Sequence, residues 1–283
     1  MTAREVAQIT GGVRVAEDGE QLRRYLGTPE LVQVDPFLLL DWFESEGGKQ
    51  SGFAPHPHRG FSTISVIIDG TMQHRDNKGN SGEVGAGGVQ FMRAGSGLLH
   101  GESSGSESGR RAGLQFWLNL PKAEKFDPPA YVNAPAETIP HETQPGADAA
   151  VLVGTTASGT KGAIDAGSTE PLMLRVALAA GASFTEKLPA DRSAFLVVIS
   201  GTVSVAGTDV SARQVAVLGA GDEVAFETSA GADVLLVAGK PIGEPVVRGG
   251  PFVMNTRQEI LQAFRDYQEG RFGAPISASG AAS

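Results

Sequence analysis

The sequence predicts an all-β chain that folds as two related antiparallel sandwiches or barrels, followed by one short helix. Glycine supplies 38 of the 283 residues and proline 16, and neither is gathered into repeats. Glycine reaches the positive φ of tight hairpins, so a chain with scattered glycines favours many short strands joined by turns. With 41% apolar residues, the chain can bury one large core or two ordinary ones.

The expected strands fall into two groups. In the first half they are Phe37–Leu40, Ser62–Ile68, Gly88–Met92 and Leu114–Leu120. In the second half they are Leu172–Leu178, Phe195–Ile199, Gln214–Leu218 and Val234–Val237, with a surface loop expected at Ala157–Ser168. Turns that contain glycine or aspartate separate many of these runs, as an antiparallel sandwich or barrel requires.

A proline-rich segment separates the two groups of strands. Pro121–Pro140 holds five prolines, which favour an extended connector with a solvated backbone. The sequence therefore predicts two domains, residues 1–135 and residues 136–283.

A short internal echo indicates that the two domains are related. In the first half, Ile68-Asp69-Gly70-Thr71 is followed by Gly85-Ala86-Gly87-Gly88. In the second half, Ile199-Ser200-Gly201-Thr202 is followed by Gly219-Ala220-Gly221-Asp222. In both halves a strand ends in a glycine turn, and a second glycine turn starts the returning strand.

The C-terminal segment has the pattern of a helix. Thr256 and Glu259 fit a capping box, and Gly270 is suited to end the helix. Ile260, Leu261 and Phe264 share one helical face, which we expect to pack on the sheets. The tail Ser277–Ser283 is small and polar, and it is predicted to be disordered.

Composition excludes several classes of function. The net charge is −9 and no basic run is longer than Arg110–Arg111, so direct nucleic-acid binding is disfavoured. The absence of cysteine excludes disulfides and thiolate metal sites. Met1–Gly12 lacks the apolar run of a signal peptide, and no stretch approaches the ~18 apolar residues of a membrane helix. We therefore expect a cytoplasmic protein.

Four of the five histidines lie between residues 56 and 100. His56-Pro57-His58 and His100-Gly101-Glu102 each place two donors at alternate positions, which point the same way on an extended segment. If the two segments are neighbours, three imidazoles and one carboxylate converge, a set that suits a divalent first-row ion. A single H-x-H pair is more often formed by surface or hydrogen-bonded histidines than by metal ligands, so the prediction depends on the joint arrangement.

The residues around these histidines resemble the pirin family of two-domain cupins. The resemblance is carried by Pro55-His56-Pro57-His58-Arg59-Gly60-Phe61, Asp69-Gly70, His74-Arg75-Asp76, Gly79-Asn80-Ser81-Gly82, Val89-Gln90-Phe91-Met92, Ala94-Gly95-Ser96-Gly97, His100-Gly101-Glu102, Leu114-Gln115-Phe116-Trp117-Leu118-Asn119-Leu120-Pro121 and Phe252-Val253-Met254-Asn255-Thr256. It implies two tandem cupin domains, each a jelly-roll-like β-barrel. Ser62, Phe91 and Arg93 depart from the residues that pirins often carry there (Glu, Trp and Thr), which leaves the substrate preference open.

Carried over by position, the resemblance implies one divalent transition metal held by His56, His58, His100 and Glu102. Iron, as Fe(II), is the usual ion of the family, and the donor set also accepts Mn, Ni, Cu or Zn. No histidine follows His141. The internal echo sets Lys187 and Pro189 opposite His56 and His58, and Val234 opposite His100. The second cupin is therefore predicted to be metal-free.

Other polar and aromatic residues near the motif have two interpretations each. His74 could serve the site as a proton carrier or as a partner of a metal ligand, but a hydrogen bond to a neighbouring strand is favoured. Arg59 could bind an anionic substrate or form a structural ion pair. Phe53, Gln115 and Trp117 could line the mouth of the site or belong to the core. His141 is expected at the surface.

The resemblance implies a metal-dependent dioxygenase that cleaves a flavonol such as quercetin with O2, in which Glu102 is both a ligand and a general base. The competing hypothesis is a non-enzymatic, iron-containing, redox-responsive regulator that binds a protein partner. A third alternative is a metal site that only stabilises the fold. The expected partners are a small aromatic substrate and O2, with no membrane or nucleic acid, and the chain is expected to be a monomer.

Overall fold

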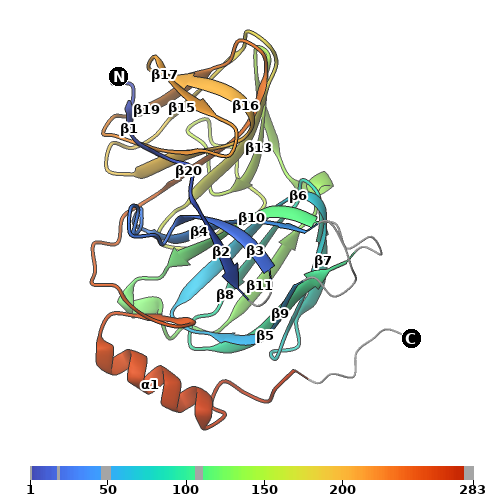
Figure 1. Cartoon of the computed structure of the whole chain (residues 1–283), viewed down its shortest axis with the longest axis vertical. Coiled ribbons are helices and arrows are strands. Elements are labelled where there is room, and N and C mark those ends of the chain that lie inside the picture. Colours follow the sequence, from blue (N-terminus) through green and yellow to red (C-terminus); the bar gives the residue numbers. More distant parts are fainter. Residues whose placement is uncertain (1, 18–19, 46–51, 106–110, 277–283) are drawn as a thin grey trace. The chain divides into compact units, whose positions relative to one another are not determined.

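The computed structural model describes residues 2–17, 20–45, 52–105 and 111–276 (Figure 1). The chain forms two compact units. The N-terminal unit comprises Arg14–Arg23, Leu40–Ala136 and Gly243–Ser283, and the C-terminal unit comprises Met1–Val13, Arg24–Leu39 and Glu137–Ile242. The predicted disorder of Ser277–Ser283 concerns residues outside the described ranges.

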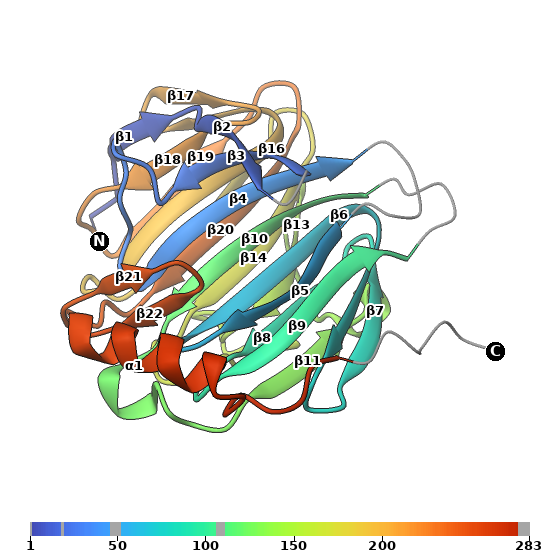
Figure 2. The same cartoon turned by 60° about the horizontal axis from the view of Figure 1, so that its bottom comes forward.

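The N-terminal unit contains a sheet with two layers. One layer has the strand order β11-β8-β6-β10-β4-β3-β2. These strands are β2 (Val13–Glu17), β3 (Glu20–Leu26), β4 (Phe37–Ser45), β6 (Phe61–Asp76), β8 (Val89–Arg93), β10 (Arg111–Asn119) and β11 (Ala130–Ala134). The second layer holds β5 (Gly52–His58), β7 (Ser81–Gly85) and β9 (Leu98–Ser104). Figure 2 shows β6, β8, β9 and β10 running alongside one another.

Strand β6 belongs to both layers. Its first half pairs with β8 and β10, and its second half, from Thr71, pairs with β7 and β9. Gly70, with φ +72°, stands between the halves. A backbone at this φ favours glycine, so the change of layer explains the first glycine of the sequence echo.

The C-terminal unit repeats this plan. One layer has the strand order β1-β18-β16-β20-β14-β13-β12. These strands are β1 (Val6–Thr10), β12 (His141–Gln144), β13 (Ala147–Val153), β14 (Leu172–Leu178), β16 (Ser193–Val205), β18 (Val215–Leu218) and β20 (Ala232–Gly239). The other layer contains β15 (Ser183–Lys187), β17 (Thr208–Ser211) and β19 (Glu223–Glu227). Strand β16 changes layer at Gly201, whose φ is +77°.

The interiors of the two units differ in polarity. Ser65 pairs with Gln90 on β8 and with Gln115 on β10. Ser65 lies five residues before Gly70, and Leu196 lies five residues before Gly201, so the two positions are equivalent. Leu196 pairs with Ala216 and Leu236. All three belong to a fully apolar core cluster. At this row the interior of the C-terminal unit is therefore apolar, whereas that of the N-terminal unit is polar.

Each compact unit is made of three segments of the chain, whereas the sequence predicts two continuous domains that meet at residue 135. The division at residue 135 stays a proposal. Strand β1 pairs with β18, so the first residues extend a sheet of the C-terminal unit. Strands β21 (Val247–Gly249) and β22 (Phe252–Met254) and helix α1 (Arg257–Gln268) belong to the N-terminal unit. Backbone pairing joins Phe252 to Arg59. A chain end can satisfy a free strand edge wherever one is exposed, regardless of sequence distance.

The proline-rich connector is more ordered than its composition indicates. It contains two 3-10 turns, Lys122–Glu124 and Ala136–Thr138, and strand β11 between them. Strand β11 pairs with β8 from Ala130 to Ala134. The prediction of a solvated backbone is wrong for β11, because its carbonyl and amide groups complete a sheet edge and its Tyr131 packs inward.

Helix α1 starts as the sequence predicts. The Thr256 side chain accepts a hydrogen bond from Glu259 N (3.2 Å), and the Glu259 carboxylate accepts one from Thr256 N (2.8 Å). Gly270 has φ +73° just beyond the helix. Among the described residues, no helix has the length and apolarity needed to cross a bilayer.

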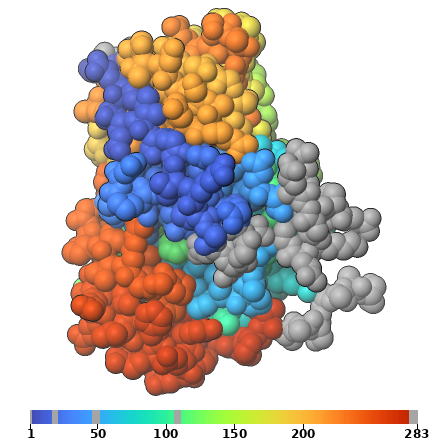
Figure 3. All heavy atoms as spheres, in the orientation of Figure 1, coloured from blue at the N-terminus to red at the C-terminus, as the bar shows by residue number. Residues whose placement is uncertain are grey.

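The predicted buried stripe of the helix is only partly right. Ile260 is buried, but Leu261 is 53% exposed and Phe264 is 37% exposed. The other buried residues are Ala263 and Asp266, because Asp266 forms an ion pair with Arg59 (2.7 Å) that turns this face inward. The C-terminal segment forms a continuous red surface on the N-terminal unit in Figure 3.

Lys125 anchors the C-terminal segment to the N-terminal unit. Its buried Nζ donates hydrogen bonds to Gly60 O (2.7 Å), Asn119 Oδ1 (2.7 Å) and Val253 O (3.2 Å). Burial lowers the pKa of Lys125 to about 8, against the opposing effect of Glu244 and Glu259.

We expect Lys125→Met to lower the free energy of unfolding of the N-terminal unit by about 2–4 kcal/mol, because it leaves three buried acceptors without a donor. Both tryptophans, Trp42 and Trp117, lie in this unit, so urea unfolding followed by tryptophan fluorescence measures it. The control is Lys122→Met at an exposed position three residues earlier. Equal unfolding midpoints for the two variants would contradict the anchoring role.

Candidate metal centre

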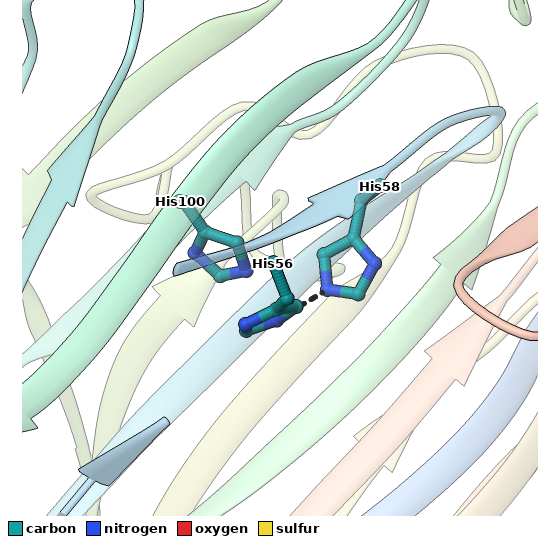
Figure 4. Close-up of side chains that lie close together, drawn as sticks. All are labelled: His56, His58 and His100. Atoms are coloured by element: carbon teal, nitrogen blue, oxygen red, sulfur yellow. Dashed lines mark hydrogen bonds between the residues drawn. The ribbon is translucent and has the colours of Figure 1, made fainter. Parts of the chain in front are cut away.

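The pairing of β5 with β9 brings the histidine motifs together. His56 lies directly opposite His100 in this antiparallel pair, as expected for neighbouring strands. The ring centroids of His56 and His100 are 4.4 Å apart, and those of His58 and His100 are 5.0 Å apart. Figure 4 shows the three rings turned toward one another. His58 and His100 are buried and His56 is half-buried.

The hydrogen bonds of His56 and His58 fix which nitrogen faces the cluster. His56 Nδ1 lies 2.8 Å from Ala54 O, and His58 Nδ1 lies 3.2 Å from Pro251 O. A carbonyl oxygen only accepts, so each Nδ1 carries the proton and each Nε2 keeps its lone pair. The two Nε2 atoms lie 3.0 Å apart (Figure 4). Two lone pairs at this distance repel unless a cation or a proton lies between them.

His100 adds a third nitrogen to the cluster. Its Nδ1 lies 3.4 Å from His74 Nδ1, while its Nε2 is buried without a hydrogen-bond partner. One ligand atom from each of His56, His58 and His100 can be chosen so that all three lie within 4.8 Å of one another.

Glu102 offers a carboxylate oxygen beside His100. Its Oε2 accepts a hydrogen bond from Gln115 Nε2 (2.9 Å), and its Oε1 is buried without a partner. Glu102 forms a second donor group with His74 and His100, again within 4.8 Å. An unpaired buried carboxylate oxygen is costly, and coordination would satisfy it. The unpaired nitrogen and oxygen atoms therefore fit a first-row transition ion, for which imidazole and carboxylate are suitable ligands.

The electrostatic environment keeps the buried imidazoles neutral. Burial, followed by the neighbouring His56, holds the pKa of His58 well below its usual range. Burial, followed by His58, His56 and His74, does the same to the pKa of His100. Neutral imidazole is the form that binds a metal, so these donors are prepared for an ion near neutral pH.

His74 lies beside the cluster on β6, opposite Glu102 on β9. Its Nδ1 lies 3.4 Å from Nδ1 of His100 on the neighbouring strand β9, a contact that fits both a strand-to-strand hydrogen bond and a partner of a candidate ligand. On the other side, its Nε2 lies 3.4 Å from Asp76 Oδ2. Burial would raise the pKa of Asp76, but hydrogen bonds from His74, Asn80 and Lys78 outweigh it and lower that pKa.

Aromatic side chains border the cluster. Trp117 meets the His58 ring edge-on at 5.3 Å and stacks on Phe61 at 4.2 Å. Phe53 lies 6.3 Å from the His56 ring. Together with the hydrogen bond from Gln115 to Glu102, these contacts place Phe53, Gln115 and Trp117 beside the candidate site.

Arg59 and His141 lie outside the histidine cluster. Arg59 pairs with Asp266, donates from Nε to Ser96 O (2.8 Å) and lies over the Phe272 ring, so its structural interpretation is the right one. His141 is on the surface of β12, 2.9 Å from Asp148.

The sequence did not single out Asp76 or Tyr131. Tyr131 stacks on His74 with ring centroids 4.2 Å apart, and it reaches this position only because the connector forms β11. Asp76 could have been found, because His74-Arg75-Asp76 repeats the alternate spacing of the two donor pairs.

Strand pairing corrects the alignment between the two units. Gln73 pairs with Ser103, and the equivalent Ser204 pairs with Glu227. This register places Val224 at the position of His100, and β15 then places Glu186 at the position of His56.

Leu188 takes the place of His58, one residue before the predicted Pro189, and Phe226 takes the place of Glu102. The predicted matches to His56 and His58 are thus wrong by one residue, which moves a side chain to the other face of a strand. The predicted match of Val234 to His100 is wrong by ten residues, because the segments between the glycine anchor and this strand differ in length in the two units. Among these four positions only Glu186 carries a donor, and the metal-free second cupin stays a prediction.

The metal-free protein should lose stability as the pH falls below about 6.5. His58 and His100 have lowered pKa values in the fold, so the unfolded chain binds more protons in this range and acidification favours it. Each imidazole should contribute about 1 kcal/mol per pH unit. Urea midpoints of chelator-treated protein between pH 7.5 and 5.5 measure the effect.

His100→Asn tests this pH dependence, because it removes one of the two buried imidazoles with a lowered pKa. The slope of the free energy of unfolding against pH should fall by the contribution of one proton. An exposed-site variant, His141→Asn, should keep the wild-type slope. A slope that is the same in all three proteins would contradict the assignment of buried neutral imidazoles.

Comparison with known proteins shows the family of the chain. A family described as "Pirin" matches residues 19–118, and one described as "Pirin C-terminal cupin domain" matches residues 173–273. A pirin-like protein from Caulobacter vibrioides is 44% identical over 276 residues, covering 96% of this chain and 100% of that protein. Pirin from Homo sapiens is 40% identical over 262 residues, covering 90% of this chain and 89% of that protein.

Solved structures share the fold. A crystal structure of quercetin 2,3-dioxygenase from Acinetobacter baumannii has a TM-score of 0.87 at 30% identity, covering 96% of this chain and 99% of that chain. A bacterial pirin from Escherichia coli, solved with nickel(II), has a TM-score of 0.67 at 19% identity, covering 81% of this chain and 95% of that chain. The predicted all-β fold of two cupin domains with a C-terminal helix is thereby confirmed. The chain belongs to the pirin family of two-domain cupins.

Proposed function

We propose that this protein is a metal-dependent dioxygenase of the pirin type that cleaves a flavonol such as quercetin with O2. One divalent transition ion, foremost Fe(II), is held by His56, His58, His100 and Glu102. The observation that carries the proposal is the grouping of donor atoms around His100: ligand atoms of His56, His58 and His100 lie within 4.8 Å of one another, Glu102 lies equally close to His100, and His100 Nε2 and Glu102 Oε1 are buried without a partner. The Acinetobacter baumannii structure, named for this activity and 30% identical, supports the substrate class.

A bound ion of this kind supplies a Lewis acid and an electron-transfer partner for oxygen. The chain supplies the remaining functions. Glu102 would bind the ion through Oε1 and, once it leaves the ion, accept the hydroxyl proton of the flavonol at that atom, while Gln115 holds Oε2 and thereby orients the carboxylate. Trp117, which is partly exposed, stacks on the buried Phe61 beside His58 and offers a flat apolar surface to an aromatic ring. Half-buried His56 places the cluster within reach of solvent.

The same donor set could also serve the non-enzymatic regulator described above, in which the oxidation state of iron changes the affinity for a protein partner. A cytoplasmic monomer remains part of either proposal. The two candidates differ in whether a flavonol is consumed, so turnover separates them.

Metal-free protein purified without a histidine tag should bind one equivalent of Fe(II) per chain under anaerobic conditions. His56→Ala removes one of the converging nitrogens and should weaken binding by roughly 10-fold or more. His141→Ala, which changes the histidine on β12, is the matched control and should bind like the wild type. Elemental analysis after gel filtration measures the stoichiometry. An unchanged metal content in His56→Ala would contradict the ligand set.

Iron-loaded protein should consume quercetin and O2 in equal amounts once oxygen is admitted. Glu102→Gln keeps the shape of the side chain but removes the base, so we expect kcat to fall by about 100-fold or more. Glu137→Gln, at an exposed position, is the control. Loss of flavonol absorbance and an oxygen electrode provide the two measurements.

If flavonol loss does not exceed that of a metal-free sample, the dioxygenase proposal fails. Capture of one stoichiometric protein partner, together with no turnover of quercetin, would favour the regulator.

A further inference from the structure

The three histidines of the candidate centre are oriented in two different ways. His56 and His58 each give their Nδ1 proton to a backbone carbonyl, of Ala54 and of Pro251. No side-chain substitution removes those acceptors. His100 is different, because the group at its Nδ1 is another side chain, His74, at 3.4 Å. The orientation of His100 therefore depends on residues that can be exchanged.

His74 is itself held from two sides. Its Nε2 faces Asp76 Oδ2 at 3.4 Å, and its ring stacks on Tyr131 with an interplanar angle of 16°. The Tyr131 hydroxyl receives a hydrogen bond from Gln90 (3.0 Å) and donates one to Asn133 (2.9 Å). These contacts restrain both the plane of the His74 ring and its rotation within that plane.

Asp76 is fixed independently of the histidines. Its Oδ1 accepts from the backbone amides of Lys78 (2.9 Å) and Asn80 (3.0 Å), and its Oδ2 accepts from Asn80 Nδ2 (2.8 Å). The carboxylate that faces His74 is thus anchored in the turn between β6 and β7.

The acceptor at Asp76 determines which ring nitrogen of His74, and then of His100, carries the proton. A carboxylate only accepts, so His74 carries its proton on Nε2 and presents the lone pair of Nδ1 to His100. His100 then carries its proton on Nδ1, which leaves the Nε2 lone pair toward the cluster. This is the nitrogen that is buried without a partner. A proton on the other nitrogen of either ring would break this order.

We propose that His74 and Asp76 are positioning residues that fix the tautomer of His100 and hold its Nε2 ready for the metal ion. The inference rests on the metal site of the proposed function and extends it to two residues on the Nδ1 side of His100. Partners of this kind raise the basicity of a metal-binding imidazole, and their removal typically weakens metal binding by roughly 10- to 100-fold.

Competition for Zn²⁺ against a chromophoric chelator tests the proposal on chelator-treated full-length protein. His74→Phe keeps a ring against Tyr131 but removes the acceptor, so Zn²⁺ affinity should fall by roughly 10- to 100-fold. Asp76→Asn can donate to His74 and reverse the proton order, so its affinity should fall in the same direction. His74→Gln restores an acceptor and should recover most of the affinity. His141→Phe is the control.

Nitrogen-15 NMR of the Zn²⁺-loaded wild type should show His100 protonated at Nδ1. Urea unfolding of each metal-free variant shows whether it is folded at the temperature of the titration. A wild type that binds no Zn²⁺ overturns the proposed metal site. A wild type that binds, with His74→Phe and Asp76→Asn binding equally well while folded, overturns only the positioning role.

Discussion

The antiparallel pairing of β5 with β9 is the constraint on which the candidate centre depends. It sets His56 opposite His100 and brings both donor pairs to one place in the barrel. Hydrogen bonds at the Nδ1 atoms then turn the rings so that the Nε2 atoms converge. His100 Nε2 and Glu102 Oε1 are buried without a hydrogen-bond partner, which costs free energy of folding. The metal ion of the proposed function would satisfy them.

The two units show how one architecture supports a polar or an apolar interior. Both contain a long strand that changes layer at a glycine, Gly70 in one and Gly201 in the other. In the N-terminal unit the row across three strands is Ser65, Gln90 and Gln115. In the C-terminal unit the equivalent row is apolar and closely packed. The backbone plan is therefore shared, and the side chains alone decide which unit can hold an ion.

The C-terminal segment contributes to the candidate centre although it is distant in sequence. It brings the carbonyl of Pro251 to His58, and thereby fixes the tautomer of that ring. Two buried cations hold the segment in place: Arg59 pairs with Asp266, and Lys125 donates to Val253 O. Arg59 follows His58 directly in the sequence. The end of this strand therefore carries both a candidate ligand, His58, and the residue that holds the C-terminal segment against it.

The sequence by itself determined the β class, the eight principal strands, the capping box of the helix and the residues of the two donor pairs. These follow from local rules, because alternation, glycine turns and cap chemistry act over a few residues. Only the tertiary structure decided that the chain termini join opposite units, that β11 forms from the connector, and that His74 is backed by Asp76 and Tyr131. It also corrected the match of Lys187 to His56 by one residue. Such features depend on pairing between distant segments, and a single sequence carries no local signal for the register of that pairing.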